Sequence, residues 1–288
     1  MTVTERFAPS PTGLLHLGHA FSALTAHDAA RAAGGRFLLR IEDIDRARCR
    51  PAFETAAIDD LGWLGLTWDA PPMRQSERGA AYAAALDRLR AMGLLYPCAC
   101  TRADMAAALS APQEGAEGQV YPGTCRNRTG PTDPGKPVAL RLHLGRALAA
   151  AGPDLWFREI GAGPNGQTGR IALDPEMMQA RIGDVALGRK DIGVSYHLCV
   201  VVDDAAQGIT HVTRGADLFE AAALHRLLQA LLNLPVPVWR HHRLIRDEGG
   251  RRLAKRDDAR SIASLRAAGA TPEDIRKMVG LRPAPRDA

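Results

Sequence analysis

The residues best suited to chemistry lie near the start of the chain, where the sequence RFAPSPTGLLHLGH runs from Arg6 to His19. A short apolar segment is followed by a turn of prolines and glycine, and a helical pattern begins close to His16. The N-terminus of a helix binds phosphate because its first backbone N–H groups have no helical partner and its dipole attracts negative charge. This segment therefore predicts a phosphate site to which His16 and His19 contribute.

Two histidines three residues apart allow other interpretations. They could be core or helix-capping side chains, or two ligands of a zinc ion, although no third ligand of suitable spacing lies nearby. Taken alone, the spacing favours the core or capping interpretation.

The elements that must position these residues follow a strand–helix–strand order. A helix is predicted from Leu17 to about Arg31, and RFLLRIEDID at 36–45 predicts a buried strand with an acidic end. In a parallel sheet, ligands bind beyond the carboxyl ends of the strands. We therefore expect Arg6–Ser10 and Glu42–Asp45 to share one crevice.

The rest of the chain continues an α/β pattern. The apolar run YHLCVVVDD at 196–204 is interpreted as a buried strand. A helix with one leucine-rich face is expected to include Leu224–Leu232, and Thr271-Pro272 predict the start of a last short helix. The segment 110–137 is rich in proline and glycine and has no periodicity, which is typical of an insertion. The remaining elements are helices at about 52–64 and 77–92 and strands at 138–144 and 209–218.

Composition narrows the class of protein. The net charge of +5 and the pI near 9.2 allow a polyanionic partner without requiring one. Five cysteines, an odd number, argue against a disulfide framework and predict a cytoplasmic location. No apolar run approaches the roughly 18 to 20 residues that span a membrane, and the first residues show no signal-peptide pattern, so no membrane association is expected. No obligate protein partner is expected either.

Several motifs together resemble class I glutamyl-tRNA synthetases. HLGH resembles the HIGH signature, and residues 252–256 resemble the KMSKS loop, with Ala254 in place of the usual serine. Only 33 residues follow Lys255, too few for a helical anticodon-binding domain. The chain therefore most resembles the stand-alone catalytic cores of that family, the glutamyl-Q tRNA(Asp) synthetases. The resemblance covers about residues 4–256 and rests on five segments that occur in the family's order: RFAPSPTGLLHLGH, RIEDID, YHLCVVVDD, ITHVTRGADL and RRLAK.

The resemblance implies a Rossmann-like catalytic core and an ATP-dependent ligase. Such an enzyme activates L-glutamate with ATP and Mg²⁺ and transfers it to queuosine, the modified base in the anticodon of tRNA(Asp). His16 and His19 would contact the ATP phosphates, and Lys255 would cover the pyrophosphate.

The same resemblance implies a glutamate pocket. Two arginines would hold the carboxylates, Glu42 would hold the ammonium group, and the Tyr196 hydroxyl would lie beside it. A structural ion pair between Arg6 and Glu42 is the alternative interpretation, because charged residues are seldom buried unless paired. The implied pocket residues are Arg6, Phe7, Ala8, Pro9, Ser10, Glu42, Tyr196 and Arg214.

Four residues could form a metal site. Cys98, Cys100, Tyr121 and Cys125 follow the pattern C-x-C, twenty residues, then Y-x-x-x-C. From spacing alone, a zinc site and a set of unrelated buried thiols are equally plausible. The match with the glutamyl-Q enzymes at all four positions implies one structural Zn²⁺.

The resemblance also predicts how the chain is divided. The basic run between Trp239 and Arg260 is the best candidate for contacts with tRNA phosphates. Three alternatives stay open: a minimal glutamyl-tRNA synthetase that charges the acceptor end, a catalytically silent tRNA-binding relative, and a small nucleotidylyltransferase. The expected segments are the first half of the core (1–97), a zinc-binding insertion (98–137), the second half with the KMSKS-like loop (138–260) and a short helical tail (261–288).

Overall fold

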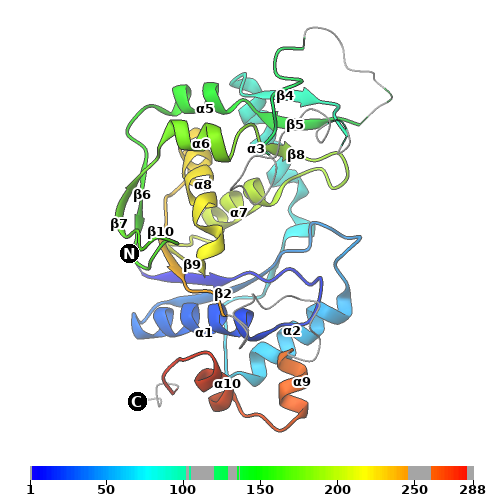
Figure 1. The fold of residues 1–288 in the computed structure, drawn as a ribbon. Helices are drawn as coiled ribbons and strands as arrows, with labels where there is room; N and C mark the ends of the chain where they lie inside the picture. Colours follow the sequence, from blue (N-terminus) through cyan, green and yellow to red (C-terminus); the bar gives the residue numbers. More distant parts are fainter. Residues whose placement is uncertain are drawn as a thin grey trace.

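The computed structural model describes residues 2–101, 104, 120–128, 135, 137–245 and 261–283. Parallel strands form its centre, and helices cover both faces of the sheet (Figure 1). The α/β class predicted from the sequence is confirmed. None of the described helices is long and apolar enough to cross a membrane.

The first half of the core is the expected strand–helix–strand unit. β1 (Thr4–Phe7) and β2 (Arg36–Ile41) pair in parallel, and α1 (Leu17–Ala32) connects them. After α2 (Pro51–Trp63), the short β3 (Met73–Arg74) adds to the free side of β2. A 3₁₀ turn at Gln75–Glu77 then leads into α3 (Gly79–Ala91). The predicted helices of this half are confirmed, and the strand predicted at 36–45 is present but ends at Ile41.

The second half contributes a four-stranded sheet in the order β7-β6-β10-β9. β9 (His211–Gly215) and β10 (Val238–His242) run parallel, and β6 (Trp156–Glu159) and β7 (Gly169–Ala172) form an antiparallel edge. This sheet adjoins the first half, because the Thr210 N–H donates to the Thr4 carbonyl at 3.0 Å.

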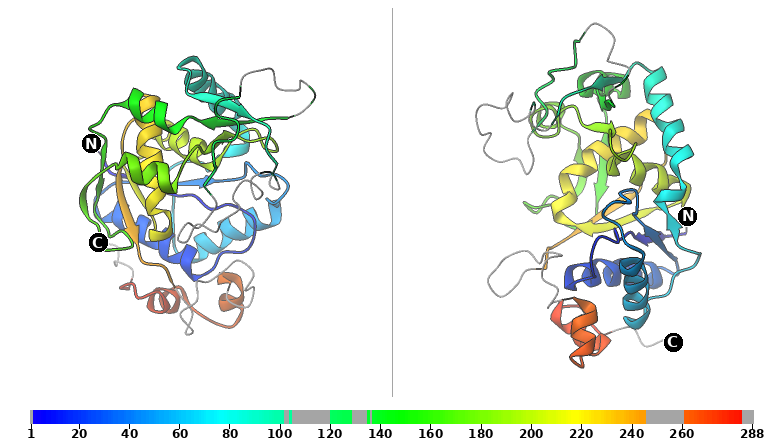
Figure 2. Two further views of the ribbon diagram at one scale, coloured as in Figure 1. Left: turned by 45° about the horizontal axis from the view of Figure 1, so that its top comes forward. Right: turned by 90° about the vertical axis from the view of Figure 1, so that its right-hand side faces the viewer.

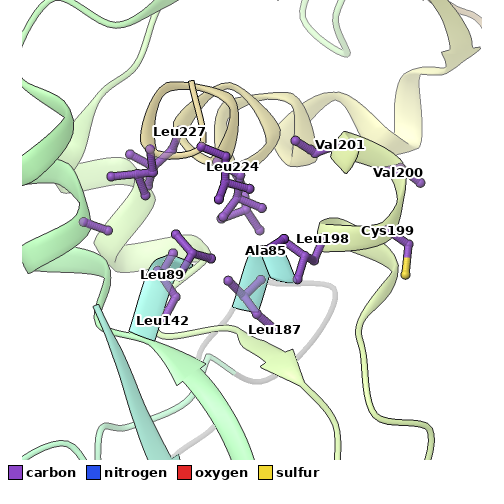
Figure 3. Packing of buried hydrophobic residues seen from close by; sticks show 14 of the residues in the cluster. Ala85, Leu89, Leu142, Leu187, Leu198, Cys199, Val200, Val201, Leu224 and Leu227 are labelled. Atoms are coloured by element: carbon purple, nitrogen blue, oxygen red, sulfur yellow. The ribbon is translucent and has the colours of Figure 1, made fainter. Parts of the chain in front are cut away.

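Helices α7 (Tyr196–Ala206) and α8 (Phe219–Leu231) pack together on the face of the sheet opposite α1 (Figure 1). A 3₁₀ turn at Ala216–Leu218 joins β9 to α8. Leu198 and Val201 of α7 meet Leu224 and Leu227 of α8 and Leu89 of α3 in the largest apolar cluster (Figure 3). The bounds of the other helices near this cluster are α5 (Leu144–Ala151) and α6 (Pro175–Arg181).

The prediction of a strand at 196–204 is wrong, since this segment lies within α7. Three consecutive valines favour a strand locally, but α3 and α8 surround the segment and tertiary packing decides its form. A helix that is buried on most sides carries a continuous apolar run just as a buried strand does. Cys199 is therefore in a buried helix, not in a strand.

A small antiparallel sheet lies at the base of the expected insertion. It contains β4 (Leu95–Cys98), β5 (Ala139–Leu142) and β8 (Ala186–Gly188). Cys98 lies opposite Ala139, so the two ends of the segment 98–137 are neighbours. The strand expected at 138–144 is present but ends at Leu142, because α5 begins two residues later.

The tail contains two short helices, α9 (Ile262–Ala267) and α10 (Pro272–Met278). They lie beside α1 and α2, away from α7 and α8 (Figures 1 and 2). Thr271 and Asp274 form a reciprocal capping box at the start of α10, which confirms the helix predicted there.

Removal of the Asp203 carboxylate is expected to destabilise the fold. Asp203 is fully buried on α7 and accepts hydrogen bonds from Gln75 (2.9 Å), Arg78 (2.6 Å) and Tyr82 (2.8 Å). Asp203→Ala leaves these donors without an acceptor and should lower the free energy of unfolding by about 3 kcal/mol, measured by urea denaturation. Asp59→Ala, at an exposed position on α2, is the control and should change it by less than about 0.5 kcal/mol. Equal stability of the two variants would contradict this role of Asp203.

Candidate active site

A cavity of about 730 Å³ opens at the carboxyl ends of β1, β2 and β9. The segment Arg6–Ser10 and Glu42 lie together in its wall, as expected for a crevice at the edge of a parallel sheet. Asp43 and Asp45 do not line it: Asp43 accepts hydrogen bonds from Ser76 and Asp45 pairs with Arg48. The residues implied for glutamate and phosphate that line the cavity are Arg6, Phe7, Ala8, Pro9, Ser10, His16, His19, Glu42, Tyr196 and Arg214.

His16 and His19 cap the first turn of α1. The Gly18 N–H donates to His16 Nδ1 and the His16 N–H donates to His19 Nδ1, each at 3.1 Å. The capping interpretation therefore describes the local geometry. A neutral ring that accepts at Nδ1 carries its proton on Nε2, which suits donation to a phosphate oxygen. Capping and phosphate binding are thus compatible roles for both rings.

Arg6 pairs with Asp204 of α7, and no ion pair joins Arg6 to Glu42. The Arg6 Nε lies 3.0 Å from Asp204 Oδ1, and Arg40 Nη1 donates to the same oxygen at 2.7 Å. Burial alone would raise the pKa of Asp204, but these two guanidinium groups outweigh it and lower the pKa. Asp204 is therefore an ionised carboxylate that orients Arg6 toward the cavity.

Glu42 lies in a different electrostatic environment. Its carboxylate is 3.5 Å from Arg40 and only 10% exposed. Burial raises its pKa to about 7, even though Arg40 and Arg6 favour the charged form. A buried carboxylate whose one ion-pair contact, with Arg40, is as long as 3.5 Å is well suited to receive the ammonium group of a substrate.

Arg214, on β9, has no carboxylate within ion-pair distance among the described residues. Its guanidinium donates to three uncharged acceptors: His241 Nε2 (3.0 Å), His225 Nδ1 (3.2 Å) and the Leu218 carbonyl (3.0 Å). The Tyr196 hydroxyl faces the same guanidinium from α7. The positive charge of Arg214 is therefore available to a ligand in the cavity.

The charges of the site match one kind of ligand. Arg6, Arg40 and Arg214 face Asp204 and Glu42, which leaves one surplus positive charge when Glu42 is ionised. L-Glutamate has two carboxylates and one ammonium group, and so one net negative charge. Glutamine has none and would leave the surplus uncompensated.

Four residues that shape this site were not predicted from the sequence. Arg40 and Asp204 stand within apolar runs, and His225 and His241 hold Arg214. A charged residue inside a buried run must have a partner, and this signal could have identified Arg40 and Asp204. No local pattern identifies the two histidines, because they come from separate elements.

Three thiols at the base of the insertion could hold a metal ion. The Sγ atoms of Cys98, Cys100 and Cys125 lie within 4.8 Å of one another, and the last two are 3.4 Å apart. The Tyr121 hydroxyl lies 3.4 Å from Cys98 Sγ and 3.6 Å from Cys100 Sγ. Ligands in a tetrahedral zinc–thiolate site are about 3.8 Å apart, because Zn–S bonds are about 2.3 Å long. The four side chains therefore fit such an ion.

Lys255 and most of the basic run from Trp239 to Arg260 lie outside the described residues. The described residues on either side are close to the cavity. Ile245 lines it, and Ser261 forms a β-bridge with His16. The Ile262 N–H donates to the Leu15 carbonyl at 2.8 Å.

Comparison with known proteins identifies the family. The family described as tRNA synthetases class I (E and Q), catalytic domain, matches residues 2–287. The chain belongs to this family.

Members of the family with the same extent share much of the sequence. A glutamyl-Q tRNA(Asp) synthetase of Rhodobacter capsulatus is 57% identical over 96% of this chain and 99% of that protein. One of Symbiobacterium thermophilum is 45% identical over 94% of this chain and 83% of that protein. A glutamate-tRNA synthetase structure from Elizabethkingia anophelis aligns with a TM-score of 0.69 and 28% identity, over 89% of this chain and 53% of that one. This class I synthetase chain thus spans about half the length of that larger enzyme.

Glutamate binding is expected to depend on pH through Glu42. The pKa of this carboxyl is raised to about 7, so below pH 7 the empty site holds a proton that the substrate ammonium group must displace. The Kd for glutamate should rise about tenfold per pH unit below 7 and level off above it, measured by calorimetry without ATP. Glu42→Gln should bind more weakly, with a Kd that does not vary between pH 6 and 8. His225 and His241 do not interfere, because burial lowers the pKa of both rings and keeps them neutral.

The same linkage affects stability with a defined sign. In the ligand-free protein, the raised pKa of Glu42 means that the folded chain holds a proton that the unfolded chain releases near pH 4.5. The contribution of Glu42 to stability should therefore fall as the pH rises from about 4.5 to about 7.

A wild-type Kd for glutamate that stays constant from pH 6 to 8 would contradict the assignment of Glu42 to the ammonium group of the substrate.

Proposed function

We propose that this chain activates L-glutamate with MgATP and transfers it to queuosine in tRNA(Asp). The observation that supports the first step is the cavity. Its wall contains both the unpaired positive charge of Arg214 and the capped N-terminus of α1. The acceptor is inferred from the curated relatives of similar length, which are named for that reaction.

In the first step, an oxygen of the glutamate α-carboxylate attacks the α-phosphorus of ATP in line. The new bond is a carboxyl–phosphate anhydride, and the bond to the β-phosphate breaks, so pyrophosphate leaves with its electron pair. The protein contributes orientation and charge stabilisation more than covalent chemistry. Arg6, Glu42 and Tyr196 would hold the amino-acid end, while His16 and His19 would donate to phosphate oxygens.

Lys255 would stabilise charge on the departing pyrophosphate. The support is its place in the KMSKS-like segment and the position of the described residues on either side, Ile245 in the cavity wall and Ser261 bridged to His16.

In the second step, a hydroxyl of the queuosine diol attacks the carbonyl carbon of glutamyl-adenylate, and AMP leaves. The excess of basic residues between Trp239 and Arg260 would contact tRNA phosphates near the cavity. A minimal glutamyl-tRNA synthetase would use the terminal adenosine instead. A silent tRNA-binding relative or a nucleotidylyltransferase has no need for the paired glutamate arginines, Arg6 and Arg214.

We infer that Cys98, Cys100, Tyr121 and Cys125 hold one structural Zn²⁺. Bound zinc would cross-link the end of β4 to residues 121–125 and would take no part in the reaction. The division into 1–97, 98–137, 138–260 and 261–288 is proposed on the same basis, because the ends of the second segment meet at the Cys98–Ala139 pair.

A labelling experiment distinguishes the possible acceptors. Radiolabelled glutamate, ATP and Mg²⁺ are incubated with the protein and one of three RNAs: tRNA(Asp) with queuosine, the same tRNA with unmodified guanosine, or tRNA(Glu). Label is expected only on the first, and it should survive removal of the terminal adenosine from the acceptor end. Label on tRNA(Glu) would favour the minimal synthetase, and absence of glutamate-dependent ATP–pyrophosphate exchange with every tRNA would contradict activation altogether.

Metal analysis tests the cysteine cluster. Protein purified without chelator should contain about one zinc per chain, as a closed structural site predicts. Cys100→Ser and Cys125→Ser should lose most of it, whereas Cys49→Ser, outside the cluster, should retain it. Equal zinc content in Cys100→Ser and Cys49→Ser would rule out the assignment.

A further inference from the structure

Arg214 is held by a chain of hydrogen bonds that continues into the protein on two sides. On one side, His241 Nε2 accepts from Arg214 Nε at 3.0 Å, and His241 Nδ1 lies 2.5 Å from Glu159 Oε2. On the other side, His225 Nδ1 lies 3.2 Å from Arg214 Nη1, and His225 Nε2 lies 3.2 Å from His197 Nδ1. Glu159, His225 and His241 do not line the cavity.

These contacts fix the proton positions. An arginine can only donate, so His241 Nε2 and His225 Nδ1 must both be unprotonated. His241 therefore carries its proton on Nδ1 and donates it to Glu159, and His225 carries its proton on Nε2 and donates it to His197. Burial is the largest factor that lowers the pKa of both rings, which keeps them neutral.

The arrangement orients the guanidinium without cancelling its charge. Arginine has five N–H groups, and the contacts with His241, His225 and Leu218 use one on each nitrogen. One N–H on each terminal nitrogen remains for the Tyr196 hydroxyl, which faces the same guanidinium, and for a carboxylate of the substrate. A carboxylate in place of either histidine would hold Arg214 equally well but would neutralise the charge that attracts the substrate.

We propose that Glu159, His241 and His225 are positioning residues that aim Arg214 at the side-chain carboxylate of the substrate and so determine selectivity for glutamate over glutamine. This inference rests on the proposed function, because it assumes that glutamate is the amino acid that is activated. None of the three residues touches the substrate, and they act only through Arg214.

The backbone around Glu159 explains why its charge matters. Oε1 of Glu159 accepts from the backbone N–H of Gly161 (2.7 Å) and of His241 (2.9 Å), while Oε2 accepts from the His241 ring. A Cβ at residue 161 would lie 2.1 Å from the His241 carbonyl, so glycine is needed for this close approach. Glu159 thus accepts from three donors and requires both carboxylate oxygens.

Glu159→Gln is the decisive variant, because it preserves shape and removes one acceptor. If the amide nitrogen faces the ring, it donates to Nδ1, and His241 must carry its proton on Nε2. That proton then points at the Arg214 N–H, and no hydrogen bond can form between the two groups. If the amide is reversed, its nitrogen opposes two backbone N–H groups. Because the first arrangement breaks fewer hydrogen bonds, Glu159→Gln should misalign Arg214 while the fold persists.

The measurement is glutamate-dependent ATP–pyrophosphate exchange in the presence of the tRNA. Glu159→Gln should raise the KM for glutamate about 10- to 100-fold, the scale of a lost hydrogen bond to a charged group, and leave the KM for ATP unchanged. Selectivity for glutamate over glutamine should fall by the same factor. The matched control is Glu5→Gln, another buried glutamate, whose Oε1 accepts from Thr213 at 3.0 Å and whose Oε2 has no partner among the described residues. It should leave both KM values unchanged.

A second pair of variants covers the case in which Glu159→Gln fails to fold. His225→Asn keeps an acceptor near Arg214 Nη1 and should retain most glutamate affinity, whereas His225→Leu should lose it to the same extent as Glu159→Gln. In the wild type, long-range ¹H–¹⁵N spectra should show the proton on Nδ1 of His241 and on Nε2 of His225.

The outcomes separate the two levels of inference. A wild-type protein that shows no glutamate-dependent exchange overturns the proposed function. An active wild type in which Glu159→Gln and His225→Leu both keep the glutamate KM, or in which His241 carries its proton on Nε2, overturns the positioning role alone.

Discussion

The burial of three arginines at the ends of parallel strands is the constraint on which this structure depends. Arg6, Arg40 and Arg214 are each less than a tenth exposed, and a buried charge is costly unless it is paired. Asp204 serves Arg6 and Arg40 together, and this shared carboxylate joins β1 and β2 of the first half to α7 of the second. Among the described residues, Arg214 has no carboxylate within ion-pair distance, so its positive charge stays unpaired in the cavity. The protein is therefore most complementary to a ligand that brings a carboxylate to that place.

Helix α7 is what makes this distribution of charge possible. Successive side chains on a helix point about 100° apart, so Asp203 and Asp204 reach different partners from adjacent positions. Asp203 serves Gln75, Arg78 and Tyr82, while Asp204 serves the arginines of the sheet. The interpretation of 196–204 as a strand would have placed the two carboxylates on opposite faces of a sheet. The wrong element type thus also concealed the partner of Arg6.

What the sequence could predict follows from the range of the interactions involved. The strand–helix–strand unit, the capped start of α1 and the capping box at Thr271 depend on residues within a few positions, and their patterns are visible locally. Ten of the residues that line the cavity could be named because the family motifs carry them in order, whereas others, such as Ser22 and His242, could not. The pairing of Arg40 with Asp204 spans 164 residues, and that of His241 with Glu159 spans 82. Such contacts are set by how the sheet assembles, and no short pattern encodes them.

The two pairs of histidines at and behind the cavity wall use hydrogen bonding in opposite ways. The Nδ1 atoms of His16 and His19 accept hydrogen bonds from backbone N–H groups at the start of their own helix. Both rings therefore carry the proton on Nε2, from which it can be donated to phosphate. His225 and His241 accept hydrogen bonds from Arg214, so the ring nitrogens that face the guanidinium carry no proton. Their other nitrogens donate to His197 and Glu159, which lie in other elements. In both pairs a neutral imidazole provides an oriented hydrogen bond, and another group carries the charge. Ionisation of His225 or His241 would add a second positive charge beside Arg214 and remove the acceptor that orients it, so burial of these rings is a requirement of the site as well as of the fold.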